Sequence, residues 1–274
     1  MSILYDTHIH TSFSPDSHED LSAQVSKAER IGLSGICITD HMDYLFPVDQ
    51  CPGHDNNPFC FDVKNYFKTT ESEIDNHKEI DIFTGVEIGL QTDSEVIEYN
   101  KKLISDNPFD EVIGSIHLID KKDPYYPEFW DDKDHSLILK RYFEITLENL
   151  KAFYGIDILG HLDYATRYMP NAGDYDPKEY FDITDAIMIF LIKHDIALEI
   201  NTSGLKKGYG LTNPHPLLIK RYYELGGRLI SVGSDAHSQD ALAYGFETLC
   251  DELKSYGFKE YAVFRARNIE LKQL

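Results

Sequence analysis

The sequence predicts a parallel α/β fold that closes, or nearly closes, into a barrel. Short runs rich in apolar and β-branched residues recur seven times, helical patterns separate them, and most of the runs end in a polar residue suited to binding metal. The chain has 274 residues, of which 42% are apolar. That length suits one α/β barrel with a single large core, so we expect residues 1–274 to form one domain.

The seven runs have nearly continuous apolar stretches, which are typical of strands buried on both faces of a parallel sheet. They cover residues 3–10, 35–41, 80–89, 111–118, 156–161, 196–202 and 228–237. Segments between them place apolar residues on one face of a helix. The four clearest stripes are Leu21, Val25, Ala28 and Ile31; Leu139, Phe143, Leu147 and Leu150; Ile183, Ile187 and Leu191; and Leu218, Tyr222 and Leu225, before Gly226 and Gly227. Strands alternating with helices predict right-handed crossovers.

Three polar segments, residues 43–62, 120–135 and 163–178, follow the carboxyl ends of predicted strands. In barrels this end carries the active site, and loops of such length are usually functional or disordered. Their many aromatic residues favour order. We therefore expect these loops to wall a substrate pocket, although aromatic packing beneath a surface loop would explain the same pattern.

The formal net charge of −21 argues against binding to nucleic acid or to anionic membranes. It would also repel a phosphate ester unless bound metal ions supplied positive charge locally. A solubility role for the acidic residues is the ordinary alternative. We expect a cytoplasmic protein without a signal peptide or transmembrane helix, in which Cys51 and Cys60 could pair or bind metal but disulfides are not favoured.

His8 and His10 lie two apart near the end of the first predicted strand, so their side chains share one face, with Asp6 beside them. Alone this pair is weak evidence, because two surface histidines would look the same. Polar residues of the same kind, however, recur where later strands end. They are Thr39-Asp40-His41, Val86-Glu87, Ser115-Ile116-His117, Gly160-His161-Leu162-Asp163 and Ser234-Asp235-Ala236-His237. Strand ends meet at one barrel mouth, so the set predicts a metal site there.

Histidines and carboxylates without thiolates suit Zn²⁺, Mn²⁺ or Fe²⁺. The candidate ligands are too many for one ion, since tetrahedral zinc takes four. They are His8, His10, Asp16, His41, Glu87, His117, His161, Asp235 and His237. Glu87 is the natural bridge, because its two oxygens can serve two ions. We expect a multinuclear cluster that hydrolyses a phosphate ester by attack of a metal-bound hydroxide.

These motifs, in this order and across nearly the whole chain, resemble the PHP (polymerase and histidinol phosphatase) family. The resemblance implies a distorted (β/α)7 barrel with three divalent ions. Within the family the chain is similar to histidinol-phosphate phosphatases, as residues 13–16, the stretch around Arg167 and residues 199–204 indicate. Many relatives carry a histidine where this chain has Asp16, with His18 nearby, which leaves the third ion's identity open.

The resemblance also implies how the ligands divide among the ions. The first ion would be bound by His8, His10, Glu87 and Asp235, the second by Glu87, His117 and His161, and the third by Asp16, His41 and His237. Arg167 could clamp the phosphate. Lys206 lies where similar sequences carry an arginine. Asn201 and Ser203 could donate to substrate, or could simply be turn residues at a strand end.

The resemblance implies that the protein hydrolyses L-histidinol phosphate to L-histidinol and phosphate. Asp235, His237 and Asp163 are candidates for protonating the leaving alcohol, and the sequence does not choose among them. Alternatives are a phosphoesterase for another small phosphate or nucleotide, a nuclease-type PHP domain, which the charge opposes, and a non-catalytic metal-binding regulatory domain, which the intact ligand set opposes. The oligomeric state is left open.

Overall fold

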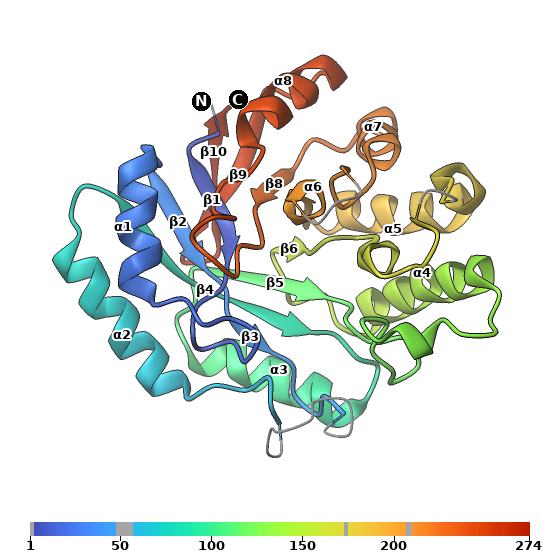
Figure 1. Cartoon of the computed structure of the whole chain (residues 1–274), viewed down its shortest axis with the longest axis horizontal. Helices are drawn as coiled ribbons and strands as arrows, with labels where there is room; N and C mark the ends of the chain where they lie inside the picture. The colour runs from blue at the N-terminus through green and yellow to red at the C-terminus, as the bar shows by residue number, and fades with distance from the viewer. Residues whose placement is uncertain (1–2, 48–56, 173–174, 207–209) are drawn as a thin grey trace.

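Seven parallel strands form the framework of the molecule in a computed structural model that describes residues 3–47, 57–172, 175–206 and 210–274 (Figure 1). The sheet order is β1-β2-β4-β5-β6-β7-β8, and β3 also pairs with β4. The strands are β1 (Tyr5–Ile9), β2 (Gly35–Ile38), β3 (His41–Met42), β4 (Asp81–Gly89), β5 (Glu111–Ser115), β6 (Ile158–Leu159), β7 (Ala197–Asn201) and β8 (Ile230–Gly233). The seven predicted strands are thereby confirmed.

The two outer strands of this order approach each other, so the sheet curves nearly into a closed ring. The amide of Asp235 donates to the carbonyl of His8 at 2.8 Å, and the amide of His10 donates to the carbonyl of Ala236 at 2.9 Å. These bonds join the end of β1 to the segment that follows β8. The predicted α/β barrel is confirmed, and its closing seam lies directly beside the first histidine pair.

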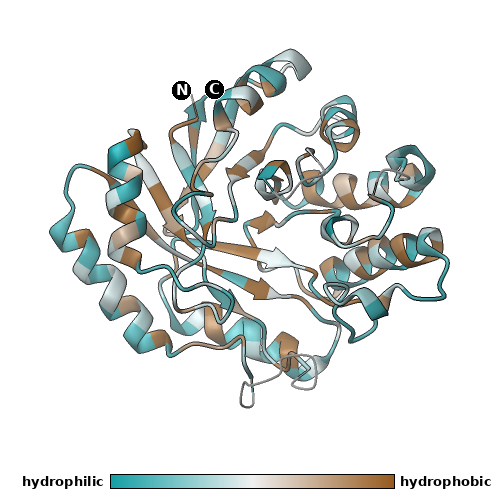
Figure 2. Ribbon diagram, in the orientation of Figure 1, coloured by the Kyte–Doolittle hydropathy of each residue, from teal (hydrophilic) through white to brown (hydrophobic). Residues whose placement is uncertain are grey.

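Helices cover the outside of the sheet, and the four predicted stripes lie in α1, α4, α5 and α7, except that Leu225 follows the last residue of α7. The helices are α1 (Leu21–Ile31), α2 (Val63–Asn76), α3 (Ser94–Asp106), α4 (His135–Ala152), α5 (Phe181–Lys193), α6 (Ser203–Lys206), α7 (Pro216–Glu224) and α8 (Phe246–Tyr256), with short 3₁₀ turns η2 (Pro127–Phe129), η3 (Tyr164–Arg167) and η5 (Pro177–Tyr180). Brown strands at the centre and teal outer helix surfaces in Figure 2 show the core between the two layers.

Aspartates fix where four of these helices begin. Asp20, Asp62, Asp93 and Asp134 each precede a helix and accept from backbone N–H groups of its first turn. Such caps satisfy donors that the helix itself leaves unpaired. At the other end of α1, Gly32 has φ +80°, a left-handed conformation that favours glycine after a helix.

The C-terminal hairpin, β9 (Glu260–Arg265) and β10 (Asn268–Gln273), was not predicted from the sequence. It lies at the amino end of the barrel, where Ala262 and Phe264 pack against Ile113, Ile158 and Ala197. Its turn is bound there by two hydrogen bonds to Asp110: the amide of Ala266 donates to the side chain and that of Arg267 to the carbonyl, both at 2.9 Å. The hairpin therefore closes the end opposite the predicted site.

Within the described ranges, no helix combines the length and apolar character that a membrane crossing requires. Cys51, proposed above as a partner of Cys60, lies outside the described residues.

Candidate metal centre

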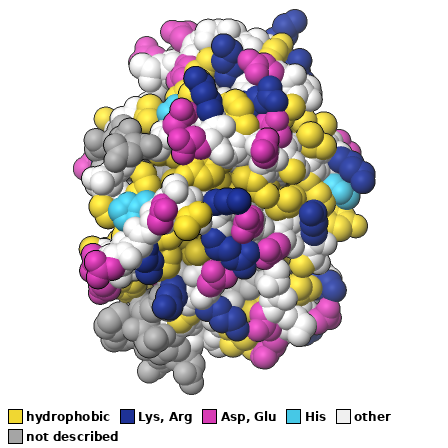
Figure 3. All heavy atoms as spheres, turned by 90° about the vertical axis from the view of Figure 1, so that its right-hand side faces the viewer, with side chains coloured by type: hydrophobic (Ala, Val, Ile, Leu, Met, Phe, Trp, Pro, Cys, Tyr) yellow, Lys and Arg dark blue, Asp and Glu magenta, His cyan; other side chains and the backbone are white. Residues whose placement is uncertain are grey.

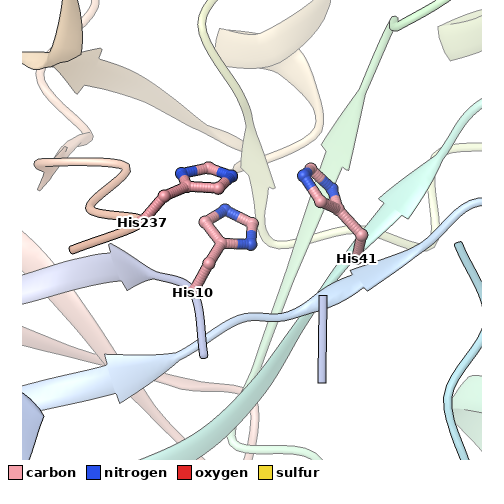
Figure 4. A group of neighbouring side chains, drawn as sticks. All are labelled: His10, His41 and His237. Atoms are coloured by element: carbon pink, nitrogen blue, oxygen red, sulfur yellow. The ribbon is translucent and has the colours of Figure 1, made fainter. Parts of the chain in front are cut away.

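Nine predicted ligands come together at the carboxyl ends of the strands. His10, His41 and His237 illustrate this in Figure 4, where their rings point toward a common point from three separate segments. The ring centroids of His10 and His237 are 4.1 Å apart, and those of His10 and His41 are 4.3 Å apart. Most of these side chains are buried, although His237 and Asp16 are partly open to solvent.

Four atoms of the first predicted group form a compact set. His8 Nε2 lies 3.0 Å from His10 Nε2 and 3.3 Å from Glu87 Oε2. Asp235 Oδ1 lies 3.3 Å from His10 Nε2 and 3.8 Å from His8 Nε2, and His10 Nε2 lies 3.5 Å from Glu87 Oε2. A tetrahedral ion with bonds of about 2.0–2.1 Å requires ligand atoms about 3.3–3.4 Å apart. These separations suit one ion.

The other carboxylate oxygen of Glu87 faces the second predicted group. Glu87 Oε1 lies 2.9 Å from His161 Nε2 and 3.2 Å from His117 Nε2, and it also accepts from the Ser115 hydroxyl at 2.6 Å. Glu87 thus divides its two oxygens between two sets of imidazoles. This is the arrangement that a bridging carboxylate requires.

Asp16 joins the third predicted group across the barrel mouth. Its Oδ2 atom lies 3.2 Å from His237 Nε2 and 3.6 Å from His41 Nε2. His41 also approaches the first group, because its Nδ1 atom lies 2.9 Å from Glu87 Oε2. The three groups therefore share Glu87 and His41 and form one continuous cluster.

That short contact between His41 and Glu87 tests whether the cluster suits metal. Despite the 2.9 Å separation, neither His41 Nδ1 nor Glu87 Oε2 has a hydrogen bond within the part of the chain that the structure describes. Leaving buried polar atoms unsatisfied costs free energy. A cation between these two buried atoms would satisfy both of them, so the residues fit bound metal ions.

A ring of further polar groups orients the histidines. His8 Nδ1 lies 2.5 Å from Glu199 Oε1, and His117 Nδ1 lies 2.5 Å from Asp43 Oδ2. Glu199 also accepts from the amide of His161 at 2.6 Å. A carboxylate on one ring nitrogen fixes the tautomer and directs the lone pair of the other nitrogen toward the ion. Asp43 and Glu199 were not predicted as site residues.

Burial and mutual attraction shift the pKa values of this cluster strongly. Burial raises the pKa of Glu87, but attraction from His8, His41 and His117 outweighs it and leaves that pKa well below its usual value. Burial lowers the pKa of His117, and its attraction to Asp43 and Glu87 raises it to about 10. The carboxylates therefore remain ionised and attract positive charge into the site.

Arg167 is buried in the cavity wall and bound by protein groups. Its guanidinium donates at 2.8 Å to Asp235 Oδ2, to Asn201 Oδ1 and to Asn213 Oδ1. Asp235 therefore turns one oxygen to Arg167 and the other to the first histidine group. Asp235 also has φ +53°, a strained conformation of the kind that recurs at functional sites.

Two other predicted residues lie outside the histidine cluster. Asp163 accepts from the Asn213 side chain at 2.6 Å and from the His215 amide at 2.8 Å, and burial raises its pKa to about 6. It lines a small neighbouring pocket rather than the main one. Lys206 is exposed and lies, with Ser203, in a separate hollow on the other side of Asp235 and His237.

The mouth of the barrel opens into a cavity of about 430 Å³. All three predicted loops contribute to its wall, as expected. The lining includes Asp16, His41, Asp43, Phe46, Phe59, His117, Asp123, Tyr125, Tyr126, His161, Tyr164, Arg167, Tyr168, Asp235 and His237. The cluster thus forms the floor of a cavity with acidic and aromatic walls.

A parallel barrel with histidines and carboxylates gathered at its mouth defines an α/β-barrel protein with a metal-binding cluster. Comparison with known proteins narrows this class. The PHP domain model matches residues 6–203. A probable histidinol-phosphatase of Clostridium acetobutylicum is 35% identical over 89% of this chain and 91% of that protein. The chain belongs to the PHP family.

Two further similarities cover nearly full lengths. The probable histidinol-phosphatase of Thermotoga maritima is 31% identical over 98% of this chain and 99% of its own. The crystal structure of the Lactococcus lactis histidinol phosphate phosphatase, complexed with zinc, L-histidinol and phosphate, superposes with a TM-score of 0.85 at 29% identity. It covers 98% of this chain and 99% of the crystallised chain.

Proposed function

We propose that this protein is a phosphomonoesterase that hydrolyses L-histidinol phosphate to L-histidinol and phosphate. The observation that carries the proposal is the division of the Glu87 carboxylate between two sets of imidazoles. One buried carboxylate placed in this way suits adjacent ions, and adjacent ions suit phosphoester hydrolysis. The similarity to histidinol-phosphatases over almost the whole chain supports the choice of substrate.

Three divalent ions, zinc, manganese or iron, would be held by the three groups. His8, His10, Glu87 and Asp235 would hold the first ion, Glu87, His117 and His161 the second, and Asp16, His41 and His237 the third. Bound ions supply a water-derived nucleophile at neutral pH and neutralise charge on the phosphoryl group. Zinc is present in the Lactococcus lactis structure, which supports zinc as one occupant.

The protein's own groups would position the phosphoryl group. Arg167 lines the cavity, and its positive charge would attract the phosphoryl oxygens while it holds Asp235 in place. Asp235 and His237 both line the cavity. Burial raises the pKa of Asp235, but Arg167 and His8 outweigh burial and hold that pKa well below its usual value. His237 is therefore the better of the two candidates for the proton that the leaving alcohol requires. Asp163, turned toward Asn213 and His215, would instead position that neighbouring loop.

The organic part of the substrate would lie against the acidic and aromatic wall. Its amine is a cation at neutral pH. Asp123, Tyr125 and Tyr168 line the cavity, and the rings of the two tyrosines are in edge contact with centroids 5.4 Å apart. A carboxylate beside aromatic faces suits an ammonium group and a neighbouring imidazole.

A substrate panel tests the proposed function. Protein loaded with Zn²⁺ or Mn²⁺ is assayed for phosphate release from L-histidinol phosphate, p-nitrophenyl phosphate and a 5′-phosphorylated oligonucleotide. We expect kcat/KM to be at least about tenfold higher for L-histidinol phosphate than for the aryl ester, because the amine adds a charge-assisted contact worth about 1.5–3 kcal/mol. Preference for the oligonucleotide, or no release from any substrate, would overturn the proposal.

Asp123→Asn tests the amine-binding wall separately. We expect KM for L-histidinol phosphate to rise about tenfold, with little change for p-nitrophenyl phosphate, because only the first substrate carries the amine. Asp131→Asn, on the exposed part of the same loop, is the matched control. Equal losses on both substrates would assign Asp123 to the metal cluster rather than to the amine.

A further inference from the structure

Helix α5 differs from an ordinary outer helix of a barrel because it is apolar almost all round. Nine of its thirteen residues, Phe181–Lys193, are apolar. Thr184, Ile187, Met188 and Leu191 are buried and form its inner face. An outer helix of a soluble barrel is expected to present polar residues to solvent on the opposite face.

The outward face of α5 instead carries an apolar centre between two opposite charges. At 100° per residue, Asp182, Ala186, Ile189 and Lys193 form one stripe opposite the buried face. Ile189 is 53% exposed, and Asp182 and Lys193 are exposed at the two ends. Figure 3 shows hydrophobic side chains gathered in a band across the side of the molecule on which α5 lies.

Neighbouring residues widen this apolar surface. Tyr154, which follows α4, is 52% exposed, and its ring centroid lies 4.7 Å from that of His194 and 6.0 Å from that of Phe190. Stable protein interfaces bury about 1,200–2,000 Å² in total, more than two single helices supply. The edges of α4 and α7 beside α5 would provide the remainder.

We infer that this face binds a second copy of the same chain, with the two α5 helices packed antiparallel about a two-fold axis at the level of Ile187 and Met188. The charge order of the stripe favours this occupant. In an antiparallel pair, Asp182 of each copy faces Lys193 of the partner subunit, while Ile189 packs near Ala186 of the partner subunit. A two-fold interface must be self-complementary, and this stripe is.

Charge complementarity matters here because each copy has a formal net charge of −21, which opposes association. Two Asp–Lys contacts at the rim would offset this repulsion locally, and the small side chain of Ala186 would let the helices approach closely. Burial of the Ile189 side chains would supply the apolar part of the binding free energy.

Sedimentation velocity of the full-length protein at 1–100 µM tests the inference. We expect wild-type protein to sediment as a dimer and Ile189→Asp as a folded monomer, with Kd raised about a hundredfold or more, because a buried charge at an interface centre has a large effect. Lys101→Glu, on the exposed face of α3, two helices away from α5 around the barrel, is the control and should remain dimeric. A monomeric wild-type protein would overturn the inference, whatever else binds this face.

Charge reversal tests the antiparallel geometry. Asp182→Lys alone and Lys193→Glu alone each place like charges at both rim contacts, so each should raise Kd about tenfold at low salt. Mixed in equal amounts, the two variants should form heterodimers with near wild-type Kd, because each rim contact then joins a basic side chain of one variant to an acidic side chain of the other. Variants that dimerise as tightly as wild type, or that do not recover on mixing, would contradict this packing. Circular dichroism and phosphate release, unchanged in every variant, keep this result separate from the proposed function.

Discussion

The two ends of the barrel both bury carboxylates, but they stabilise them differently. At the amino end, Asp157 accepts from the amide of Val112 at 2.8 Å and pairs with the guanidinium of Arg267. At the carboxyl end, Glu87 is fully buried among imidazoles, and one of its oxygens has no hydrogen bond among the described residues. An arginine and an amide satisfy Asp157 within the protein itself. At the second end, cations from outside the chain would satisfy the Glu87 oxygen that the described residues leave without a hydrogen bond.

This difference indicates that the fold and the site have separate sources of stability. The C-terminal hairpin closes the amino end without a ligand. At the mouth, buried lone pairs lack hydrogen bonds among the described residues, and a bound metal ion would satisfy them. Variants at the mouth should therefore change metal content and turnover most, and variants at the amino end should change the free energy of unfolding most. Four substitutions test this contrast, beginning with the largest expected effect.

Glu87→Gln should have the largest effect. The amide cannot bridge two cations as a carboxylate does, so turnover should fall by more than the roughly 100-fold seen when outer ligand partners are lost. Metal content, measured by mass spectrometry, should fall with it. Glu71→Gln, on the exposed face of α2, serves as the matched control. If Glu87→Gln kept the metal content and turnover of the wild type, Glu87 would not be a bridging ligand.

Asp43→Asn should have the next largest effect. Its carboxylate orients His117 from 2.5 Å, and an amide would hold the ring with a neutral contact. We expect metal affinity, measured against a competing chelator, to fall about 10–100-fold, with turnover recovered by excess metal. Loss of turnover at unchanged metal affinity would instead place Asp43 in contact with the substrate.

Asp43 and Glu199 are site residues that the sequence did not predict. The strand pattern located the histidines, because strand ends of a parallel sheet must meet. The carboxylates that orient those histidines are separated from them by 74 and 191 residues, and no local pattern encodes such pairs. The C-terminal hairpin was missed for the same reason: its Arg267 meets Asp157, 110 residues earlier.

Arg167 shows a further limit of the sequence. Its position in the chain predicted a phosphate contact, and the structure places it in the cavity wall as well as in hydrogen bonds to Asp235, Asn201 and Asn213. A residue type and its neighbours in sequence do not reveal how many of its donors the protein itself occupies. Its role toward phosphate stays a prediction.

Arg267→Ala tests the stability of the amino end. The change leaves the buried Asp157 carboxylate without its guanidinium and removes a donor to the Gly155 carbonyl. Loss of a fully buried partner costs about 3–5 kcal/mol, and the 29% exposure of the Arg267 side chain reduces the expected loss to about 1–3 kcal/mol. Urea unfolding should show this loss, while turnover per folded molecule stays at the wild-type level. Arg30→Ala, on the exposed face of α1, is the control. A lower turnover per folded molecule would mean that the amino end affects the site at the mouth.

Glu111→Gln should have the smallest effect, and it should appear only as pH rises. Glu111 is fully buried at the start of β5, and burial, together with the nearby Asp157 carboxylate, raises its pKa well above 4.5. The unfolded chain releases this proton near pH 4.5, and the native protein releases it only at higher pH. The wild-type free energy of unfolding therefore falls between these two values, by up to about 1.4 kcal/mol per pH unit.

Glutamine resembles the neutral acid in shape and has no proton to lose, so it isolates this contribution. At pH 4 the variant and the wild type should unfold at similar urea concentrations. From pH 5 to pH 7 the variant should become progressively the more stable. A stability difference that does not vary with pH would mean that Glu111 is ionised in the native protein. The amino end would then, like the mouth, hold a charge that the chain alone does not neutralise.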